Sequence, residues 1–291
     1  MKKQLSYTLR LLLLSGVAVI MGTSCIFIPP KENKEVINSE VETADDGSTI
    51  LKKDGLTCVW QDEFDYTGVP NPEKWRYQTG AGGWGNAEVQ TYVSNTETPD
   101  TAIVENGVLT IKAYKDGNTW KSARLNSKQN WKYGLIEARM KVTNRNGAWP
   151  AFWMMPQNSE YGEWPASGEI DIMENAPSTC GSNRVFSTLH AAGHYAGDGQ
   201  SIGAAVYDEN LSSEWHTFGV KWEENKITAY YDDVEMDSYD NNHTESDWPY
   251  DKEFYIILNL AIGGNLGGPS SHVNALGNEA NFIIDYVRVY Q

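Results

Sequence analysis

The sequence predicts an all-β domain, a β-jelly-roll sandwich of two curved antiparallel sheets with a concave cleft. From residue 56 to residue 291, short runs of alternating apolar and polar residues are separated by Gly, Asn, Asp and Pro. This pattern is typical of strands that bury one face. No long amphipathic helix and no short repeat is evident. The segment is long for a simple sandwich, so we expect two large sheets and a groove on the concave one.

Six runs of residues predict strands most clearly, because each combines β-branched or aromatic residues with a polar face. Two dipeptides next to these runs, Glu224-Asn225 and Asp232-Asp233, suit hairpin turns. The six runs are 108–114, 134–142, 215–222, 226–231, 254–260 and 282–290.

The first 55 residues are predicted to lie outside the globular domain. Three basic residues precede an apolar run that ends at Met21, and small residues then lead to Cys25. We interpret residues 1–24 as a bacterial signal peptide and Cys25 as the lipidated first residue of a lipoprotein; plain secretion is the alternative. The apolar run is short for a membrane-spanning helix. Residues 25–55 are polar and charged, which predicts a flexible tether.

Composition limits the possible partners. A formal net charge of −16 argues against nucleic acid and anionic membrane surfaces. The chain has 11 Trp and 16 Tyr, more than a core usually needs, which favours a carbohydrate partner. Cys58 and Cys180 have no spacing signature, and we expect two buried thiols rather than a pair. We expect a monomer.

Three acidic residues, Glu169, Asp171 and Glu174, lie within six positions. On a strand, Glu169 and Asp171 share a face, but strict alternation would turn Glu174 away. A β-bulge at Ile172-Met173 would bring Glu174 back to the side of the other two. We therefore predict a bulged strand that presents all three acids together.

Crowded carboxylates raise the proton affinity of at least one member, because like charges resist joint ionisation. A protonated acid beside an ionised one is the requirement for cleaving a glycosidic bond. With the bulge, Glu169 and Glu174 are about 13 Å apart at Cα, which leaves a carboxyl gap of about 5 Å. This gap favours a retaining mechanism. A solvated acidic face or a divalent cation site is the alternative.

Several longer motifs surround these acids, and together the chain from Cys58 to Gln291 resembles glycoside hydrolase family 16, in particular its laminarinase-like β-glucanases. The resemblance implies a jelly-roll with a cleft, retained anomeric configuration and no cofactor for catalysis. It implies that Glu169 is the nucleophile, Glu174 the general acid and base, and Asp171 a hydrogen-bond partner of the nucleophile. The motifs include Trp60-Gln-Asp-Glu-Phe-Asp65, Gly83-Trp-Gly-Asn-Ala-Glu-Val-Gln-Thr-Tyr92, Trp149-Pro-Ala-Phe-Trp-Met154, Gly168-Glu-Ile-Asp-Ile-Met-Glu174 and Asp285-Tyr-Val-Arg-Val-Tyr290.

The resemblance also implies residues that contact the glycan. Of Trp149 and Trp153, one is expected to face the cleft and the other the core, with Trp149 favoured for the cleft. A lone His is more often structural, but the resemblance gives His190 a place near the acids. The full predicted set is Trp164, Trp149, Asn86, Arg124, His190 and Trp84.

A structural Ca²⁺ ion on the convex side is a further implication. Asp285 would supply a side-chain oxygen, and Glu63 and Gly107 would supply main-chain oxygens. The alternative is that Asp285 ends a hydrogen-bond network.

The leading hypothesis is an endo-acting enzyme on β-1,3-glucan, mixed-linkage β-1,3/1,4-glucan or both. The motif that begins at Gly83 favours these substrates over sulfated galactans, and an acidic protein suits a neutral polymer. The alternatives are a non-catalytic glycan-binding lipoprotein on the same fold and a family relative acting on a galactan. The expected setting is the bacterial cell envelope, facing the periplasm or the cell surface.

Overall fold

The computed structural model describes residues 34–95, 101–195, 202–241, 244 and 246–291. The predicted signal peptide and Cys25 lie outside these residues, so the predictions made for them stay predictions. Among the described helices, none has the length and apolar run needed to cross a bilayer.

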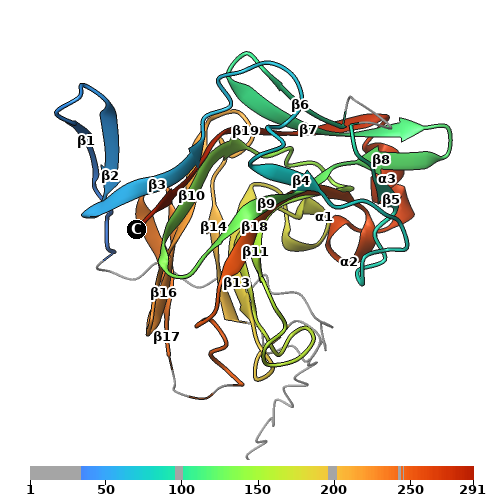
Figure 1. Ribbon diagram of the computed structural model, residues 1–291. Helices are drawn as coiled ribbons and strands as arrows, with labels where there is room; N and C mark the ends of the chain where they lie inside the picture. Colours follow the sequence, from blue (N-terminus) through green and yellow to red (C-terminus); the bar gives the residue numbers. More distant parts are fainter. Residues whose placement is uncertain (1–33, 96–100, 196–201, 242–243, 245) are drawn as a thin grey trace, which may run out of the picture.

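Two antiparallel sheets lie face to face, as the sequence predicts (Figure 1). The only parallel pair among the described strands joins β5 to β8. The larger sheet has twelve strands: β1 (Ser39–Thr43), β2 (Thr49–Lys53), β3 (Leu56–Asp62), β5 (Gln90–Tyr92), β6 (Ala102–Glu105), β7 (Val108–Asp116), β8 (Thr119–Ser122), β10 (Gly134–Lys141), β15 (His216–Glu223), β16 (Lys226–Tyr231), β17 (Val234–Asp240) and β19 (Glu279–Tyr290).

The smaller sheet has seven strands and carries the acidic triplet. Its order is β14-β13-β12-β11-β18-β9-β4. The bounds are β4 (Trp75–Tyr77), β9 (Arg124–Trp131), β11 (Ala148–Pro156), β12 (Glu169–Glu174), β13 (Arg184–His190), β14 (Ile202–Tyr207) and β18 (Phe254–Ile262). Three short helices follow strands of this sheet: α1 (Pro177–Cys180) follows β12, and α2 (Gly264–Gly267) and α3 (Ser270–Ala275) follow β18.

The main core lies between the two sheets and is filled by alternate residues of their strands. On β10, Ile136, Ala138 and Met140 are fully buried in this core, and on β12 the residues Ile170 and Met173 join it. Burial of this apolar area is the main favourable term in folding. It also determines which side chains are left for the outer faces of the sheets.

Both predicted hairpin turns are confirmed. Glu224 and Asn225 connect β15 to β16, and Asp232 and Asp233 connect β16 to β17. The two aspartates have φ angles of 48° and 65°, which is the left-handed geometry of a two-residue hairpin turn and one that Asp tolerates.

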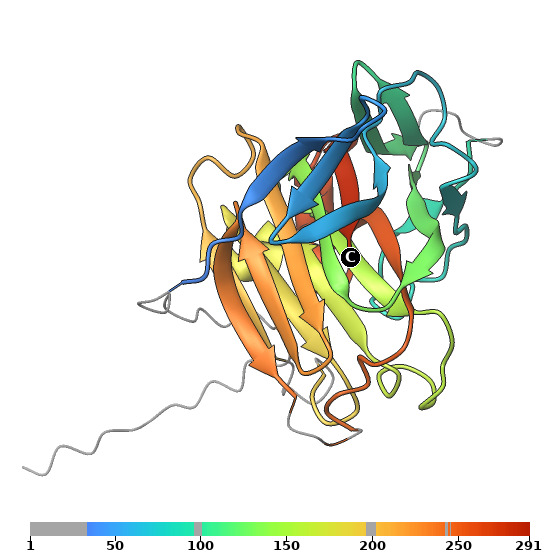
Figure 2. The same cartoon turned by 60° about the vertical axis from the view of Figure 1, so that its left-hand side comes forward.

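The segment predicted as a flexible tether contains ordered structure, which corrects that prediction for its second half. Strands β1 and β2 form a hairpin, and β2 pairs with β3 at the edge of the larger sheet. Ile37 packs with Leu135, Tyr230 and Tyr290 in a separate apolar cluster. These three alternate with core residues on their strands, so the cluster lies on the outer face of the larger sheet, where Figure 2 shows the blue hairpin in front of the sandwich.

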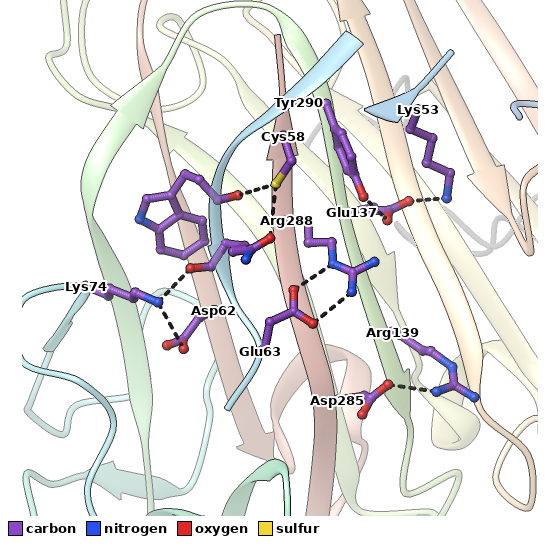
Figure 3. A network of polar contacts seen from close by, with 12 residues as sticks. Lys53, Cys58, Asp62, Glu63, Lys74, Glu137, Arg139, Asp285, Arg288 and Tyr290 are labelled. Atoms are coloured by element: carbon purple, nitrogen blue, oxygen red, sulfur yellow. Dashed lines mark hydrogen bonds and ion pairs between the residues drawn. The ribbon is translucent and has the colours of Figure 1, made fainter. Parts of the chain in front are cut away.

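A buried ion pair joins the hairpin to strand β10 of the larger sheet. The Lys53 ammonium lies 2.5 Å from a carboxylate oxygen of Glu137, and Tyr290 donates to the other oxygen at 3.2 Å (Figure 3). Lys53 is 3% exposed and Glu137 is 1% exposed. The sequence around Lys53 is polar, and its burial depends on a carboxylate 84 positions away.

The expectation of two buried thiols is wrong. Cys58 is a free thiol but is only partly buried, and its thiol contacts the carbonyl of Trp60. Cys180 is buried and disulfide-bonded. Because Cys58 is free, the two do not pair with each other.

Candidate active site

The predicted β-bulge is present at Ile172-Met173. Along β13, Asp171 pairs with Thr188 while Glu174 pairs with Phe186, so three steps on β12 match two steps on β13. The extra residue places both Ile172 and Met173 in the core. Glu169, Asp171 and Glu174 therefore all lie on the outer face of the smaller sheet.

All three carboxyls hold protons more tightly than free acids do. Burial is the largest cause for each. It raises the pKa of Glu169 to about 8, with the charge of Asp171 adding to the effect. It raises the pKa of Asp171 to about 7, and it raises the pKa of Glu174 well above its ordinary value. The carboxyls of Glu169 and Asp171 also share a hydrogen bond.

Each carboxyl has its own hydrogen-bond partner. Trp149 Nε1 donates to Glu174 at 2.8 Å, and Trp164 Nε1 donates to Glu169 at 2.5 Å. His190 Nε2 lies 3.0 Å from an oxygen of Asp171. No described Lys or Arg forms an ion pair with any of the three acids. The site therefore stabilises carboxylate charge by hydrogen bonds rather than by a cation.

A small apolar cluster covers the Glu174 end of the triplet. Trp149 and Phe186 belong to it, together with Ala176 and Cys180 next to and within helix α1. Glu174 pairs with Phe186 on one side and with Ala151 on the other. This surrounding explains why desolvation is the first cause of the raised Glu174 pKa.

Trp149 and Trp153 both lie on the acid-bearing face, so the expectation that one of them faces the core is wrong. Residues four apart on a regular strand share a face. Strand β11 pairs with β18 without a register shift from Trp149 to Trp153. Trp149 is 8% exposed and packs in the outer cluster. Trp153 is less buried and donates to Asn259 at 2.6 Å.

Arg124 and Trp84 form a second group on this face. The Arg124 guanidinium lies between two rings, 4.9 Å from the centroid of Trp84 and 4.6 Å from that of Trp153. Pairing across β11, β18 and β9 aligns Glu174, Ala151, Asn259 and Arg124 in one row. Three strand spacings separate the ends of this row, about 14 Å.

Asn86 lies at the edge of this second group. Its side-chain oxygen accepts from Asn265 at 3.3 Å, and its side chain also bonds Glu88, whose carboxyl is attracted by Arg124. Glu88 in turn accepts from Tyr92, and Tyr92 accepts from Asn259 at 3.0 Å. A continuous polar network thus links the loop around Trp84 to the centre of the sheet.

Comparison with known proteins follows from this geometry. The model for glycosyl hydrolases family 16 matches residues 89–286, which is more than half of the chain. The chain belongs to glycosyl hydrolase family 16. A β-glucanase of Rhodothermus marinus is 37% identical over 246 residues, covering 80% of this chain and 84% of that protein.

Solved family 16 structures agree with the fold. The laminarinase from Rhodothermus marinus superposes with a TM-score of 0.74 at 34% identity, covering 80% of this chain and 96% of that one. A variant of SCLam, a non-specific endo-β-1,3(4)-glucanase crystallised with 1,3-β-D-cellotriosyl-glucose, gives a TM-score of 0.74 at 30% identity. That alignment covers 88% of this chain and 99% of the other.

The family 16 site includes residues that the sequence analysis did not single out. Tyr195 packs edge-on against Trp164, with ring centroids 5.6 Å apart, and Tyr250 donates to the main-chain oxygen of His190 at 2.9 Å. Tyr195 follows β13 outside any predicted strand, so no pattern marked it. The position of Trp153 on the acid-bearing face could have been found by applying alternation from Trp149.

Two cavities among the described residues lie away from the acids. One, of about 350 Å³, is lined by Lys141, Arg145, Glu279 and their neighbours, and the other, of about 300 Å³, by Lys132, Glu160 and Asp251 among others. Neither cavity is lined by a residue of the triplet. The candidate site is therefore the acid-bearing face of the smaller sheet and not one of these cavities.

The acids and His190 do not fit a resident metal. Glu169, Asp171 and His190 offer ligand atoms within 4.8 Å of one another. A histidine that binds a metal almost always donates its second nitrogen to a fixed acceptor. His190 Nδ1 is buried and has no hydrogen-bond partner among the described residues. We therefore assign this cluster to acid–base chemistry.

The three residues predicted to bind calcium lie near strand β19. Strands β3 and β7 both pair with β19 and meet it on either side of Asp285, which brings Glu63 and Gly107 to the same place. Arg288 binds the Glu63 carboxylate at 2.7 and 2.8 Å. Arg139 donates to Asp285 at 2.7 Å, so Asp285 already takes part in an ion pair, as the alternative to a calcium site predicts (Figure 3).

Proposed function

We infer that the chain is a retaining endo-β-glucanase that hydrolyses internal β-glycosidic bonds of β-glucan. The observation that carries this conclusion is the bulge in β12, which presents Glu169, Asp171 and Glu174 on one face with no compensating Lys or Arg. A non-catalytic glycan-binding protein has no need for three such acids. The family 16 relatives named as β-glucanase and laminarinase support the same conclusion.

In the first step, the Glu169 carboxylate attacks the anomeric carbon while the glycosidic C–O bond breaks. Trp164 donates to Glu169 and keeps one of its oxygens fixed. Glu174 gives its proton to the departing oxygen. The apolar cluster around Trp149 and Phe186 raises the pKa of Glu174, which favours the protonated form that a general acid requires.

In the second step, water attacks the anomeric carbon of the glycosyl ester on Glu169. Glu174, now ionised, accepts the proton of that water, and the ester bond breaks. Two inversions give net retention of configuration. Trp149 Nε1, 2.8 Å from Glu174, stabilises the ionised form that acts as base.

Incubation with laminarin and with barley β-glucan tests the assignment. Proton NMR of the first-formed products is expected to show the β-anomer before mutarotation, and the early products are expected to be oligosaccharides of mixed length. An α-anomer would contradict retention, and the absence of new reducing ends on both substrates would contradict the glucanase assignment.

For the linkage, we propose cleavage of β-1,3-glucan and of mixed-linkage β-1,3/1,4-glucan. Support comes from the relatives, which include a laminarinase and a non-specific endo-β-1,3(4)-glucanase at comparable TM-scores. Comparison of kcat/KM on the two polymers measures the preference. We also propose that the protein is a monomer; light scattering in solution measures its mass.

A structural Ca²⁺ at Asp285, Glu63 and Gly107 is a separate proposal, supported by the convergence of β3 and β7 at Asp285. Calcium would stabilise the larger sheet, far from the acids. Thermal unfolding of chelated protein is expected to shift upward by several degrees when Ca²⁺ is added. Asp285→Asn should abolish that shift, and an equal shift in both proteins would contradict the site.

We also propose that the protein is anchored in the bacterial envelope through a lipid on Cys25. The support is the sequence of residues 1–25 alone, which lie outside the described residues. Mass spectrometry of the mature N-terminus is expected to find a lipidated Cys25, and Cys25→Ser should release the protein from the membrane fraction. A mature N-terminus without a lipid, or unchanged membrane association of Cys25→Ser, would contradict the anchor.

A further inference from the structure

His190 lies on β13 directly beside the nucleophile. It pairs with Glu169 across the two strands, and its ring reaches Asp171, where Nε2 lies 3.0 Å from a carboxylate oxygen. Asp171 in turn shares a hydrogen bond with Glu169. The three side chains thus form a line in which His190 contacts Asp171 and Asp171 contacts Glu169.

The position of the His190 ring is fixed from two sides. Tyr250, which is fully buried, donates to the His190 main-chain oxygen at 2.9 Å. The ring of Trp164 lies 6.1 Å from the His190 ring, centroid to centroid. Tyr250 therefore holds the backbone of His190, and Trp164 packs against one side of its ring.

The hydrogen bonds also define the tautomer. Nδ1 is buried and has no partner in the described part of the chain, and a buried N–H without an acceptor is costly. The proton of a neutral ring therefore belongs on Nε2, where it is donated to Asp171.

We propose that His190 is a positioning residue for the nucleophile: by donating to Asp171, it holds Asp171 against Glu169 and favours the singly ionised state of that pair. The acid–base residue Glu174 has a different donor, Trp149. The two donors thus act on different acids, His190 on Asp171 and Trp149 on Glu174. This role differs from contact with the sugar, which the family resemblance suggested.

Other titratable groups lie on the elements packed around His190, and none of them forms a hydrogen bond with its ring in the described structure. They are Glu169 and Glu174 on β12, His194 and Tyr195 after β13, and Asp247 and Tyr250 before β18.

The test is the pH dependence of kcat/KM on laminarin for His190→Ala and His190→Gln. Loss of the donor destabilises the ionised pair, so the acidic limb of His190→Ala should move up by about one pH unit. Activity should fall about tenfold at acidic pH and recover largely at alkaline pH. His190→Gln retains an N–H donor, so the acidic limb of its kcat/KM profile should lie close to that of the wild type. His272→Ala, a histidine on α3, is the matched control.

A second measurement separates the nucleophile from the acid. On an aryl β-glucoside with a very acidic leaving group, Glu174→Gln should lose little in the first step, because no proton is needed there. The relative loss for His190→Ala should be the same on the aryl substrate as on laminarin. A raised KM with an unshifted acidic limb in the folded His190→Ala protein would overturn the proposal.

This inference depends on the proposed function, and the two can fail separately. A wild-type protein that releases no sugar from any β-glucan overturns the function. An active wild type whose pH profile is unchanged by His190→Ala overturns only the role of His190.

Discussion

Each outer face of the sandwich buries acidic side chains beside a small apolar cluster, and the two faces treat the charge differently. On the larger sheet, Glu137 is paired with Lys53 and accepts from Tyr290. On the smaller sheet, Glu169, Asp171 and Glu174 receive only neutral donors and His190. Burial is similar on both faces, and the difference is the presence of a cation.

This difference separates a structural acid from reactive ones. A buried carboxylate with a lysine partner is ionised and held in one place, and its removal leaves an uncompensated charge. Buried carboxylates without a cation share protons instead, which raises their pKa values toward the working pH. Groups that titrate near neutral pH can give and take protons during a reaction.

The largest effect is expected from Glu169→Gln. Without a nucleophile the first step fails, and kcat/KM on laminarin should fall by about 10⁴-fold or more while the fold is retained. Initial rates of reducing-end release measure this change. Glu163→Gln changes an exposed glutamate nearby and should retain activity. A near-normal rate for Glu169→Gln would show that another residue attacks the sugar.

The next largest effect concerns the paired acid. Lys53→Met leaves Glu137 buried without a cation and should lower the free energy of unfolding by about 3–5 kcal/mol. Urea denaturation measures it. Lys52→Met, which removes only a surface pair with Glu42, should cost less than about 1 kcal/mol. Adding Glu137→Gln to Lys53→Met should recover much of the loss; a double variant as unstable as the single one would contradict the charge explanation.

The reactive acids should also affect stability as a function of pH. Their pKa values are raised in the folded protein, to about 8 for Glu169 and about 7 for Asp171. The folded state therefore binds more protons than the unfolded state between about pH 4 and pH 8, and stability falls as pH rises through this window. Differential scanning calorimetry should show that Glu169→Gln loses less stability between pH 5 and pH 8 than the wild type. Identical slopes would contradict the raised values.

A smaller effect is expected from Arg124→Lys on the acid-bearing face. Lysine keeps the charge but loses the planar group between Trp84 and Trp153, so KM for laminarin should rise about fivefold to tenfold with kcat nearly unchanged. Arg139→Lys alters a similar Arg–Trp contact, with Trp215, on the other sheet and should leave KM unchanged. A fall in kcat alone would place Arg124 in the chemical step instead.

Alternation along one strand was enough to predict the bulge and the common face of the acids, because both depend on neighbouring residues. The resemblance, not spacing, assigned the roles of Glu169 and Glu174. The docked hairpin was missed because β1 is exposed along its whole length and the buried Lys53 is paired with the distant Glu137 and Asp233. Such long-range pairing leaves no local pattern.

Because of the bulge at Ile172-Met173, the two glutamates face the same side of β12 even though one extra residue separates them. Deletion of Met173 would leave Glu-Ile-Asp-Ile-Glu, in which plain alternation already turns all three acids outward. Deletion of Ile170 would instead rotate Asp171 into the core. A one-residue gap in a sequence alignment is therefore harmless at Met173 and destructive at Ile170. The motif with the bulge and the motif one residue shorter present the same three acids on one face.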